Sequence, residues 1–494
     1  MASRSSLFLA RYLAGLQCER RLWLADREPQ QGNPEVASVE DLLSRGGEIR
    51  ERARCLFPGA RAVAITDHAR AVEATRWLVA DAAVPAVLCA AFEHNSVRVR
   101  VDVLERLPRG RWKLCCVVEA GTVREADLDG AALELFAARG SGLGVCSVEV
   151  VHPDESYVRG PGGIDWTAYF ARRDVTRDVE LLVEDVPAQV ERFARLLESP
   201  VEPEAEPSPH CRRPWPCEFR EHCLRGLPRD WIDRLPGLRS SRFHALRAAG
   251  IARISEIPED FPLRAVQAQA RAAYRAGELS LSPDLKGALA DFGPPSDYLD
   301  FEAIAPVIPV YPGTRPFQAL PFGWSLHRRD ATGGLAHRDF LASGSDDPRR
   351  AFAESLVAAL SASGEPVVVY SPFESRILHD LALELPDLAP ELGRIRTRLR
   401  DLYPLVRSGV YHVGFAGSLS LKRVSSVLSP GFGYADLEDV SDGGAAARLF
   451  ERIARGELAP ADDDRARTAL RAYCSRDSQA LATVHRSLLQ RTAA

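Results

Sequence analysis

The sequence predicts an α/β protein, and three observations lead to that fold class. Stretches with helical periodicity alternate with short runs of apolar and β-branched residues in both halves of the chain. Residues 199–209 are so rich in proline that they cannot form a regular element, which indicates a linker. The chain has 494 residues, enough for two to four domains, and we expect domains over 1–225, 226–290 and 291–494.

The composition is that of an ordinary globular protein, with 46% hydrophobic and 27% charged residues. The net charge of −5 gives no overall basic character, so contacts with nucleic acid would have to come from local arginine clusters. No apolar run approaches the roughly 18 residues of a membrane span. Residues 1–24 have the pattern of an amphipathic helix and not of a signal peptide. We therefore expect no membrane association and a cytoplasmic location.

In the first domain, helical patterns precede and follow a run of strand-like segments. We expect helices over 5–24, 37–56, 66–82, 126–138 and 176–197. We expect strands over 86–92, 97–104, 111–120 and 144–151. A helical region, a three-strand meander, a helix and a further strand together form an α/β core.

The cysteines of this domain indicate a metal or cluster site, because a disulfide framework is not expected in a long cytosolic chain. Cys211, Cys217 and Cys223 are each separated by five residues, in a segment rich in proline and aromatic residues. Three thiolates need a fourth ligand to hold tetrahedral zinc or an iron–sulfur cubane. Cys18 is the candidate, since the basic and aromatic segment 20–23 follows it. The alternative is three small buried hydrophobic residues.

This arrangement resembles the RecB-type iron–sulfur nucleases, and the CRISPR-associated exonucleases of that group are the nearest comparison. The resemblance rests on Cys18 with the Arg-Arg-x-Trp that follows at 20–23, and on the three later cysteines. It covers about residues 1–225. It implies a PD-(D/E)XK-like fold whose two ends are joined by a 4Fe–4S cluster bound to the four cysteines, with zinc as the alternative metal.

The active-site motif of that family is incomplete here. Asp102 matches the acid of one strand, but Cys116 and Val118 stand where the next strand should carry Glu-x-Lys. Glu119 is one residue out of register and would face the other side of the strand. We therefore expect a degenerate active site, kept for binding or as a scaffold. Compensation by Glu93 or Glu119 stays open.

The segment 226–290 is helical with short loops. Its Leu-Pro-Gly-Leu turn at 235–238 and its Ala-Gly-Ile turn at 249–251 are similar to a helix-hairpin-helix unit. The amides of such turns contact phosphates. A plain helical connector is the alternative.

The third domain carries a strand pattern at 297–302 with Asp300 and Glu302 two residues apart. Side chains alternate along a strand, so both carboxylates share one face. They repel each other unless a cation lies between them, which indicates a divalent metal. A solvated strand face also shows this pattern by chance.

Further acids follow in the third domain. Strand patterns appear at 324–327, from 340 and at 366–370, and a helix is expected over 349–362. Glu374 falls on the first turn of the next helix, beyond the carboxyl end of a strand, where sites of α/β proteins form. Near the C-terminus, Tyr473 and Asp477 share one helix face at positions i and i+4.

This order of motifs resembles the DEDD exonucleases of the RNase H-like fold, and it is most similar to the bacterial family called domain of unknown function 2779. Some members of that family carry a RecB-like domain in front. The resemblance implies two-metal hydrolysis of a phosphodiester. Asp300, Glu302 and Asp477 would hold Mg²⁺ or Mn²⁺, Glu374 would complete the coordination, and Tyr473 would orient the attacking water. Glu374 departs from the pattern, which usually has Asp.

The sequence therefore predicts an enzyme: a metal-dependent nuclease, 3′–5′ and exonucleolytic, on DNA or RNA that is single-stranded or has a free end. Its cluster-bearing N-terminal module would bind the nucleic acid. Lys422, ahead of the last helix, either contacts phosphate or is simply solvated. The alternative function is a catalytically inactive nucleic-acid-binding scaffold built from two nuclease folds. No protein partner is predicted.

Overall fold

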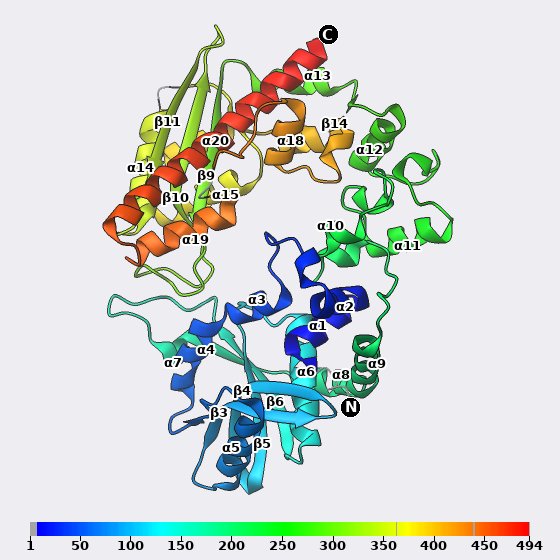
Figure 1. Cartoon of the computed structure of the whole chain (residues 1–494). Coiled ribbons are helices and arrows are strands. Elements are labelled where there is room, and N and C mark those ends of the chain that lie inside the picture. The colour runs from blue at the N-terminus through cyan, green and yellow to red at the C-terminus, as the bar shows by residue number, and fades with distance from the viewer. Residues whose placement is uncertain (1–6, 362, 438–439, 494) are drawn as a thin grey trace. The chain divides into compact units, whose positions relative to one another are not determined.

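The computed structural model describes residues 7–361, 363–437 and 440–493. The chain forms two compact units, unit 1 and unit 2, whose boundary lies between Leu227 and Pro228 (Figure 1). Both units combine helices with a mixed sheet, so the α/β prediction is confirmed. The expected connector, 226–290, falls almost wholly within unit 2. Within the described residues, no helix is both long enough and apolar enough to cross a membrane.

Unit 1 is built on a sheet of seven strands. They are β1 (Leu7–Phe8), β2 (Arg61–Ala62), β3 (Ala86–His94), β4 (Val97–Leu107), β5 (Arg111–Val117), β6 (Val145–Pro153) and β7 (Phe170–Asp174). The strand order is β2-β3-β4-β5-β6-β7, and β1 pairs with β4. β3, β4 and β5 form the expected antiparallel meander, while β6 runs parallel to β5.

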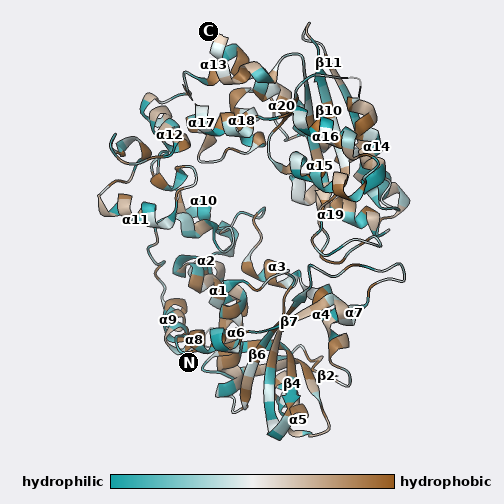
Figure 2. Ribbon diagram, turned by 180° about the vertical axis from the view of Figure 1, so that it is seen from behind, coloured by the Kyte–Doolittle hydropathy of each residue, from teal (hydrophilic) through white to brown (hydrophobic). Residues whose placement is uncertain are grey.

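The helices of unit 1 cover this sheet, with α5 packed on β3 and the alanine-rich α6 packed on β3 and β4. They are α1 (Leu9–Gln17), α2 (Glu19–Arg27), α3 (Val39–Ser44), α4 (Gly47–Ala53), α5 (His68–Ala80), α6 (Glu125–Gly140), α7 (Trp166–Tyr169), α8 (Thr176–Val183), α9 (Val186–Glu198) and α10 (Arg220–Cys223). Many helices carry hydrophilic and hydrophobic residues side by side, as expected for helices that cover a sheet (Figure 2).

The expected helix over 5–24 begins later, at Leu9, and is interrupted once in the structure; residues 5 and 6 lie outside the described residues. Leu7 and Phe8 extend as β1 and pair with Val97 and Arg98 of β4. Cys18, with φ −165° and ψ 124°, has extended backbone and separates α1 from α2. Helical periodicity continues across such a break, because the face that packs on the core stays the same.

The segment after the linker returns to pack on the N-terminal helices. Gln17 donates to the carbonyls of His210 and Trp215, at 2.9 and 2.8 Å. Arg21, whose side chain is fully buried, donates to Glu218 at 2.6 Å. The two ends of unit 1 are therefore joined by direct polar contacts.

Unit 2 is built on a sheet of five strands in the order β11-β10-β9-β12-β13. They are β9 (Ser296–Ile304), β10 (Leu320–Arg329), β11 (Leu335–Leu341), β12 (Val367–Val369) and β13 (Leu399–Asp401). β10 is antiparallel to β9 and to β11, whereas β12 is parallel to β9 and to β13. A separate two-stranded sheet pairs β8 (Ser280–Leu281) with β14 (Val410–Tyr411).

Helices cover both faces of this sheet. Leu299 and Phe301 of β9 pack with α14 and α15 in one core cluster, while Ile304 packs with α19 and α20 in another. A bulge between Pro321 and Gly323 changes the register of β10 against β9. The helices are α11 (Ser240–Ala248), α12 (Ala265–Ala276), α13 (Leu285–Ala288), α14 (Pro348–Leu360), α15 (Phe373–Glu384), α16 (Ala389–Arg398), α17 (Tyr403–Gly409), α18 (Leu421–Leu428), α19 (Gly443–Ala454) and α20 (Pro460–Ala493).

We expect Arg21→Met to lower the free energy of unfolding of unit 1 by about 3–5 kcal/mol, because it leaves the Glu218 carboxylate buried without its cation. Urea unfolding of the full chain measures this change. The double variant Arg21→Met/Glu218→Met should recover much of the loss, since it removes the unpaired charge. A single variant as stable as the wild type would show that this ion pair does not hold the ends together.

Candidate metal centre

Three carboxylates converge in unit 2. Asp300 and Glu302 lie on β9, two residues apart, and Asp477 comes from α20, which packs against β9 and β10. One carboxylate oxygen of each residue lies within 4.8 Å of those of the other two. Glu302 and Asp477 are each 8% exposed. We call these three residues the carboxylate cluster; β9 and α20 provide it in the arrangement that a metal ion needs.

Two oxygens of the carboxylate cluster have no hydrogen-bond donor. Asp300 Oδ2 and Asp477 Oδ1 are buried and accept no hydrogen bond from any residue that the structure describes. An unpartnered buried acceptor is costly, and a buried negative charge costs more. Oxygen donors of this kind suit Mg²⁺ or Mn²⁺, so the residues fit the metals that the sequence predicted.

The pKa shifts of the carboxylate cluster also fit a bound divalent cation. Burial raises the pKa of Asp300 well above its usual value, and the charges of Asp477, Glu302 and Glu374 raise it further. Burial and the charge of Asp477 raise the pKa of Glu302 to about 8. Burial also raises the pKa of Asp477, although contacts with Tyr434 and Tyr473 partly offset this. The cluster therefore holds more negative charge than the neighbouring positive charge balances.

Glu374 lies beside this group without being one of its three members. It occupies the first turn of α15, is 4% exposed and accepts a hydrogen bond from Ser371 Oγ at 3.0 Å. Burial raises its pKa to about 7, and the charge of Asp401 on β13 adds to this effect. The structure thus places the middle acid next to the cluster, where its charge acts on Asp300.

Tyr434 was not predicted as part of this site, and Lys422 was predicted only to contact phosphate or to be solvated. Tyr473, one helical turn before Asp477, is buried, and Tyr434 also approaches Asp477 from the loop before α19. Lys422 Nζ lies 4.9 Å from the ring centre of Tyr434 and 4.5 Å from that of Tyr473. Its charge lowers the pKa of all three cluster carboxylates. Tyr434 gave no signal in the sequence, because its loop has no periodicity.

The four cysteines predicted to bind a cluster come together in unit 1. Burial raises the pKa of Cys223 to about 11, and the charges of Cys211 and Cys18 add to this. The Cys217 amide donates to the Cys211 carbonyl at 2.9 Å. All four lie in the described part of the chain, and no three of them bring their sulfurs within 4.8 Å of one another. Their thiols are neighbours, spaced more widely than a single small ion requires.

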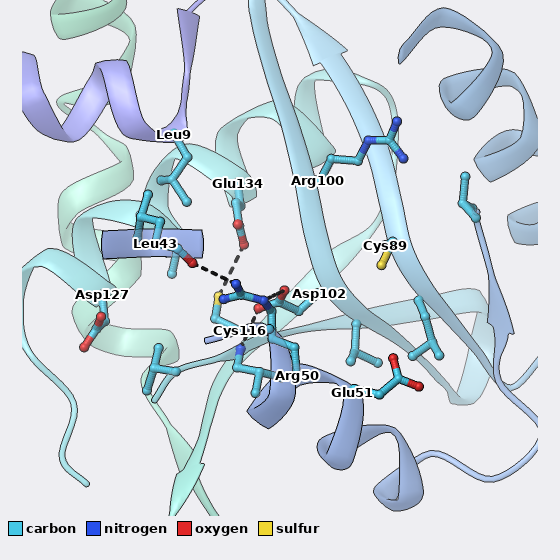
Figure 3. A pocket seen from close by; sticks show the side chains of 18 of the residues that line it. Leu9, Leu43, Arg50, Glu51, Cys89, Arg100, Asp102, Cys116, Asp127 and Glu134 are labelled. Carbon is cyan, nitrogen blue, oxygen red and sulfur yellow. Dashed lines mark hydrogen bonds and ion pairs between the residues drawn. The ribbon is translucent and has the colours of Figure 1, made fainter. Parts of the chain in front are cut away.

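Asp102 lies in a second candidate site, a cavity of about 750 Å³ in unit 1 (Figure 3). It accepts a hydrogen bond from the Val117 amide at 2.8 Å, and Arg50 Nε lies 3.9 Å from its carboxylate. Glu51, Asp127 and Glu134 also line the cavity, and of these three Glu134 of α6 is the buried one, whereas Glu119 and Glu93 are not among the lining residues. Glu134 is the functional candidate that sequence reasoning missed. A lone acid in an apolar helix, within 131–138, was its only signal.

Cys116 contacts the buried acid Glu134 of this cavity. Its Sγ donates to Glu134 Oε2 at 3.3 Å. Burial raises the pKa of Glu134 to about 8, with a contribution from the charge of Asp102, and burial raises the pKa of Asp102 to about 6. The carboxyl of Glu134 therefore carries its proton at neutral pH.

Glu105, Cys115 and Glu149 also bring their ligand atoms within 4.8 Å of one another. Their charges are already compensated: Arg172 lies 2.7 Å from Glu105 and 2.6 Å from Glu149, and Lys113 lies within 3.7 Å of both. These residues form an ion-pair network on the sheet, and their negative charges do not require a metal ion.

We expect Glu134→Gln to stabilise the protein more at about pH 9 than at about pH 5. The folded-state pKa of Glu134 lies above its ordinary value of 4.5, so its contribution is complete below that value and is lost as the pH rises through about 8. Glutamine cannot ionise and avoids this loss. The melting temperatures of variant and wild type at the two pH values test this, with exposed Glu125→Gln on the same helix as the control. A difference that stays constant with pH contradicts the burial argument.

Comparison with known families supports part of the sequence analysis. Residues 297–420 match a family described as a domain of unknown function, DUF2779, which confirms the expected resemblance over that range. The match begins in β9 and ends directly before α18, so it includes Asp300, Glu302 and Glu374. No curated protein and no solved structure matches the chain.

Proposed function

We propose that the chain is a metal-dependent nuclease whose chemistry takes place in unit 2. The observation that carries the proposal is the carboxylate cluster, in which Asp300, Glu302 and Asp477 converge with two buried oxygens lacking any donor among the described residues. A site that concentrates negative charge without compensation fits divalent cations, which in turn suit a phosphodiester substrate.

Each residue of the site has a defined part in this proposal. Asp300, Glu302 and Asp477 would hold two Mg²⁺ or Mn²⁺ ions, and Glu374 would complete the ligand set from α15. When bound, such ions would lower the pKa of water and stabilise negative charge on the phosphate. Tyr473, one turn from Asp477 on α20, orients the attacking water. The buried walls of the site limit the entry of bulk water, which strengthens each of these interactions.

The topology of unit 2 supports an RNase H-like fold of the DEDD type. Three antiparallel strands are followed by two parallel strands on the other side of β9, so the strand with the first two acids lies at the centre of the sheet. The last acid comes from a long C-terminal helix. Together with the DUF2779 match, this favours a 3′–5′ exonuclease on DNA or RNA with a free end.

Unit 1 is proposed to bind the nucleic acid through a PD-(D/E)XK-like fold closed by a 4Fe–4S cluster on Cys18, Cys211, Cys217 and Cys223. A single tetrahedral zinc ion with Zn–S bonds of about 2.3 Å would hold its sulfurs about 3.8 Å apart. That no three of these thiols, all in the described residues, meet within 4.8 Å of one another supports a larger cluster. Polar contacts of Gln17 and Arg21 with the 210–218 segment bring the two halves of the ligand set together.

We expect Asp300→Asn or Asp477→Asn to reduce degradation of end-labelled single-stranded DNA or RNA by roughly 10³-fold or more, because each substitution removes a metal ligand. Gel analysis with Mg²⁺ or Mn²⁺ measures this, with Asp102→Asn as the matched change in unit 1. Cleavage that survives in Asp300→Asn but is lost in Asp102→Asn would place the chemistry in unit 1. Binding without cleavage by the wild type would favour the inactive scaffold.

We expect protein purified without oxygen to contain iron and acid-labile sulfide, and Cys18→Ser to lose both and to melt at a lower temperature. Chemical analysis and visible absorption measure the cluster independently of any activity. The exposed Cys55→Ser serves as the control and should keep its iron. Zinc in place of iron, lost on the same substitution, would replace the cluster by a zinc site.

A further inference from the structure

Lys422 occupies a defined position beside the carboxylate cluster. It lies in the first turn of α18, whose N-cap Ser420 accepts a hydrogen bond from the Arg423 amide. Its Nζ lies over the rings of Tyr434 and Tyr473 and donates to the Ser441 carbonyl at 2.6 Å. Cation–π contacts with two rings and one hydrogen bond fix the ammonium group in place.

Lys422 is also unusual in this composition. Only Lys113, Lys286 and Lys422 are lysines among the 63 basic residues; the others are arginine. A compact ammonium group fits between two aromatic rings and donates in several directions, whereas a planar guanidinium would have to stack on one of them. The chemistry of the site, more than the general composition, accounts for lysine at this position.

The charges of the site leave the ammonium group of Lys422 available to bind an anion of the substrate. Asp300, Glu302, Glu374 and Asp477 carry four negative charges when ionised, and two divalent ions balance them. No negative charge of the cluster is then left to balance the positive charge of Lys422. A phosphodiester brings one negative charge, and an ammonium group has three donors, of which Ser441 uses one.

We propose that Lys422 is a phosphate-binding residue of unit 2, which contacts a non-bridging oxygen of the nucleic-acid backbone beside the metals. The inference rests on the proposed nuclease function and adds a substrate contact to it. Tyr434 and Tyr473 are positioning residues in this respect, because they hold the ammonium group and need not touch the phosphate. A purely structural Lys422, which only ties α18 to Ser441, is the competing explanation.

Binding of a short single-stranded oligonucleotide tests the phosphate contact. The full chain is titrated in Ca²⁺, with a gel to verify that the strand stays intact, over a series of salt concentrations. We expect Lys422→Met to weaken binding about tenfold and to make the slope of log K against log salt shallower by about 0.7. Lys286→Met, at an exposed position of the same unit, should leave the slope unchanged.

Binding of Mn²⁺ alone, measured by calorimetry, separates the two explanations. Removal of a neighbouring cation should tighten Mn²⁺ binding several-fold in Lys422→Met, while oligonucleotide binding weakens. A structural role would weaken both. An unchanged salt slope in a protein that cleaves nucleic acid overturns this inference alone. A wild type that binds Mn²⁺ but neither binds nor cleaves nucleic acid overturns the proposed function, and this inference with it.

Discussion

The mutual repulsion of three buried carboxylates is the constraint on which unit 2 depends. A strand and a helix that present Asp300, Glu302 and Asp477 to one another must be held together against that repulsion. Ser478, next to Asp477, meets Ser325 Oγ at 2.6 Å and His327 Nδ1 at 2.8 Å. Further along α20, His485 Nδ1 forms a hydrogen bond with the Tyr298 hydroxyl at 2.9 Å. These buried hydrogen bonds fasten α20 to the sheet next to the acid and further towards the C-terminus of the helix.

Asp297, three residues before Asp300, is an acid of the same strand that lies outside the carboxylate cluster. It is fully buried on the opposite face of β9, but Arg328 donates to it at 2.6 Å and Arg398 at 3.3 Å. Its charge is neutralised by side chains of the sheet and of α16. The chain thus supplies the cations that neutralise Asp297, whereas two oxygens of the carboxylate cluster have no donor among the described residues.

Local periodicity was enough to predict the members of the site that share an element. The two-residue spacing of Asp300 and Glu302 and the i, i+4 spacing of Tyr473 and Asp477 follow from strand and helix geometry alone. Lys422, Tyr434 and the partnership of Glu134 with Asp102 depend on which elements pack together, which no local pattern contains. The break at Cys18 was missed because the residues on both sides of it are helical.

The two units differ in how they balance buried acids, and that difference argues for a division of roles. In unit 1, Asp102 has Arg50 and a backbone amide as partners, and Glu134 keeps its proton beside Cys116. Among the described residues, both Asp102 and Glu134 therefore have partners. In the described part of unit 2, two carboxylate oxygens have no donor, although Lys422 lies nearby. This uncompensated charge is the reason why we propose metal-dependent chemistry for unit 2 and only binding of the strand for unit 1.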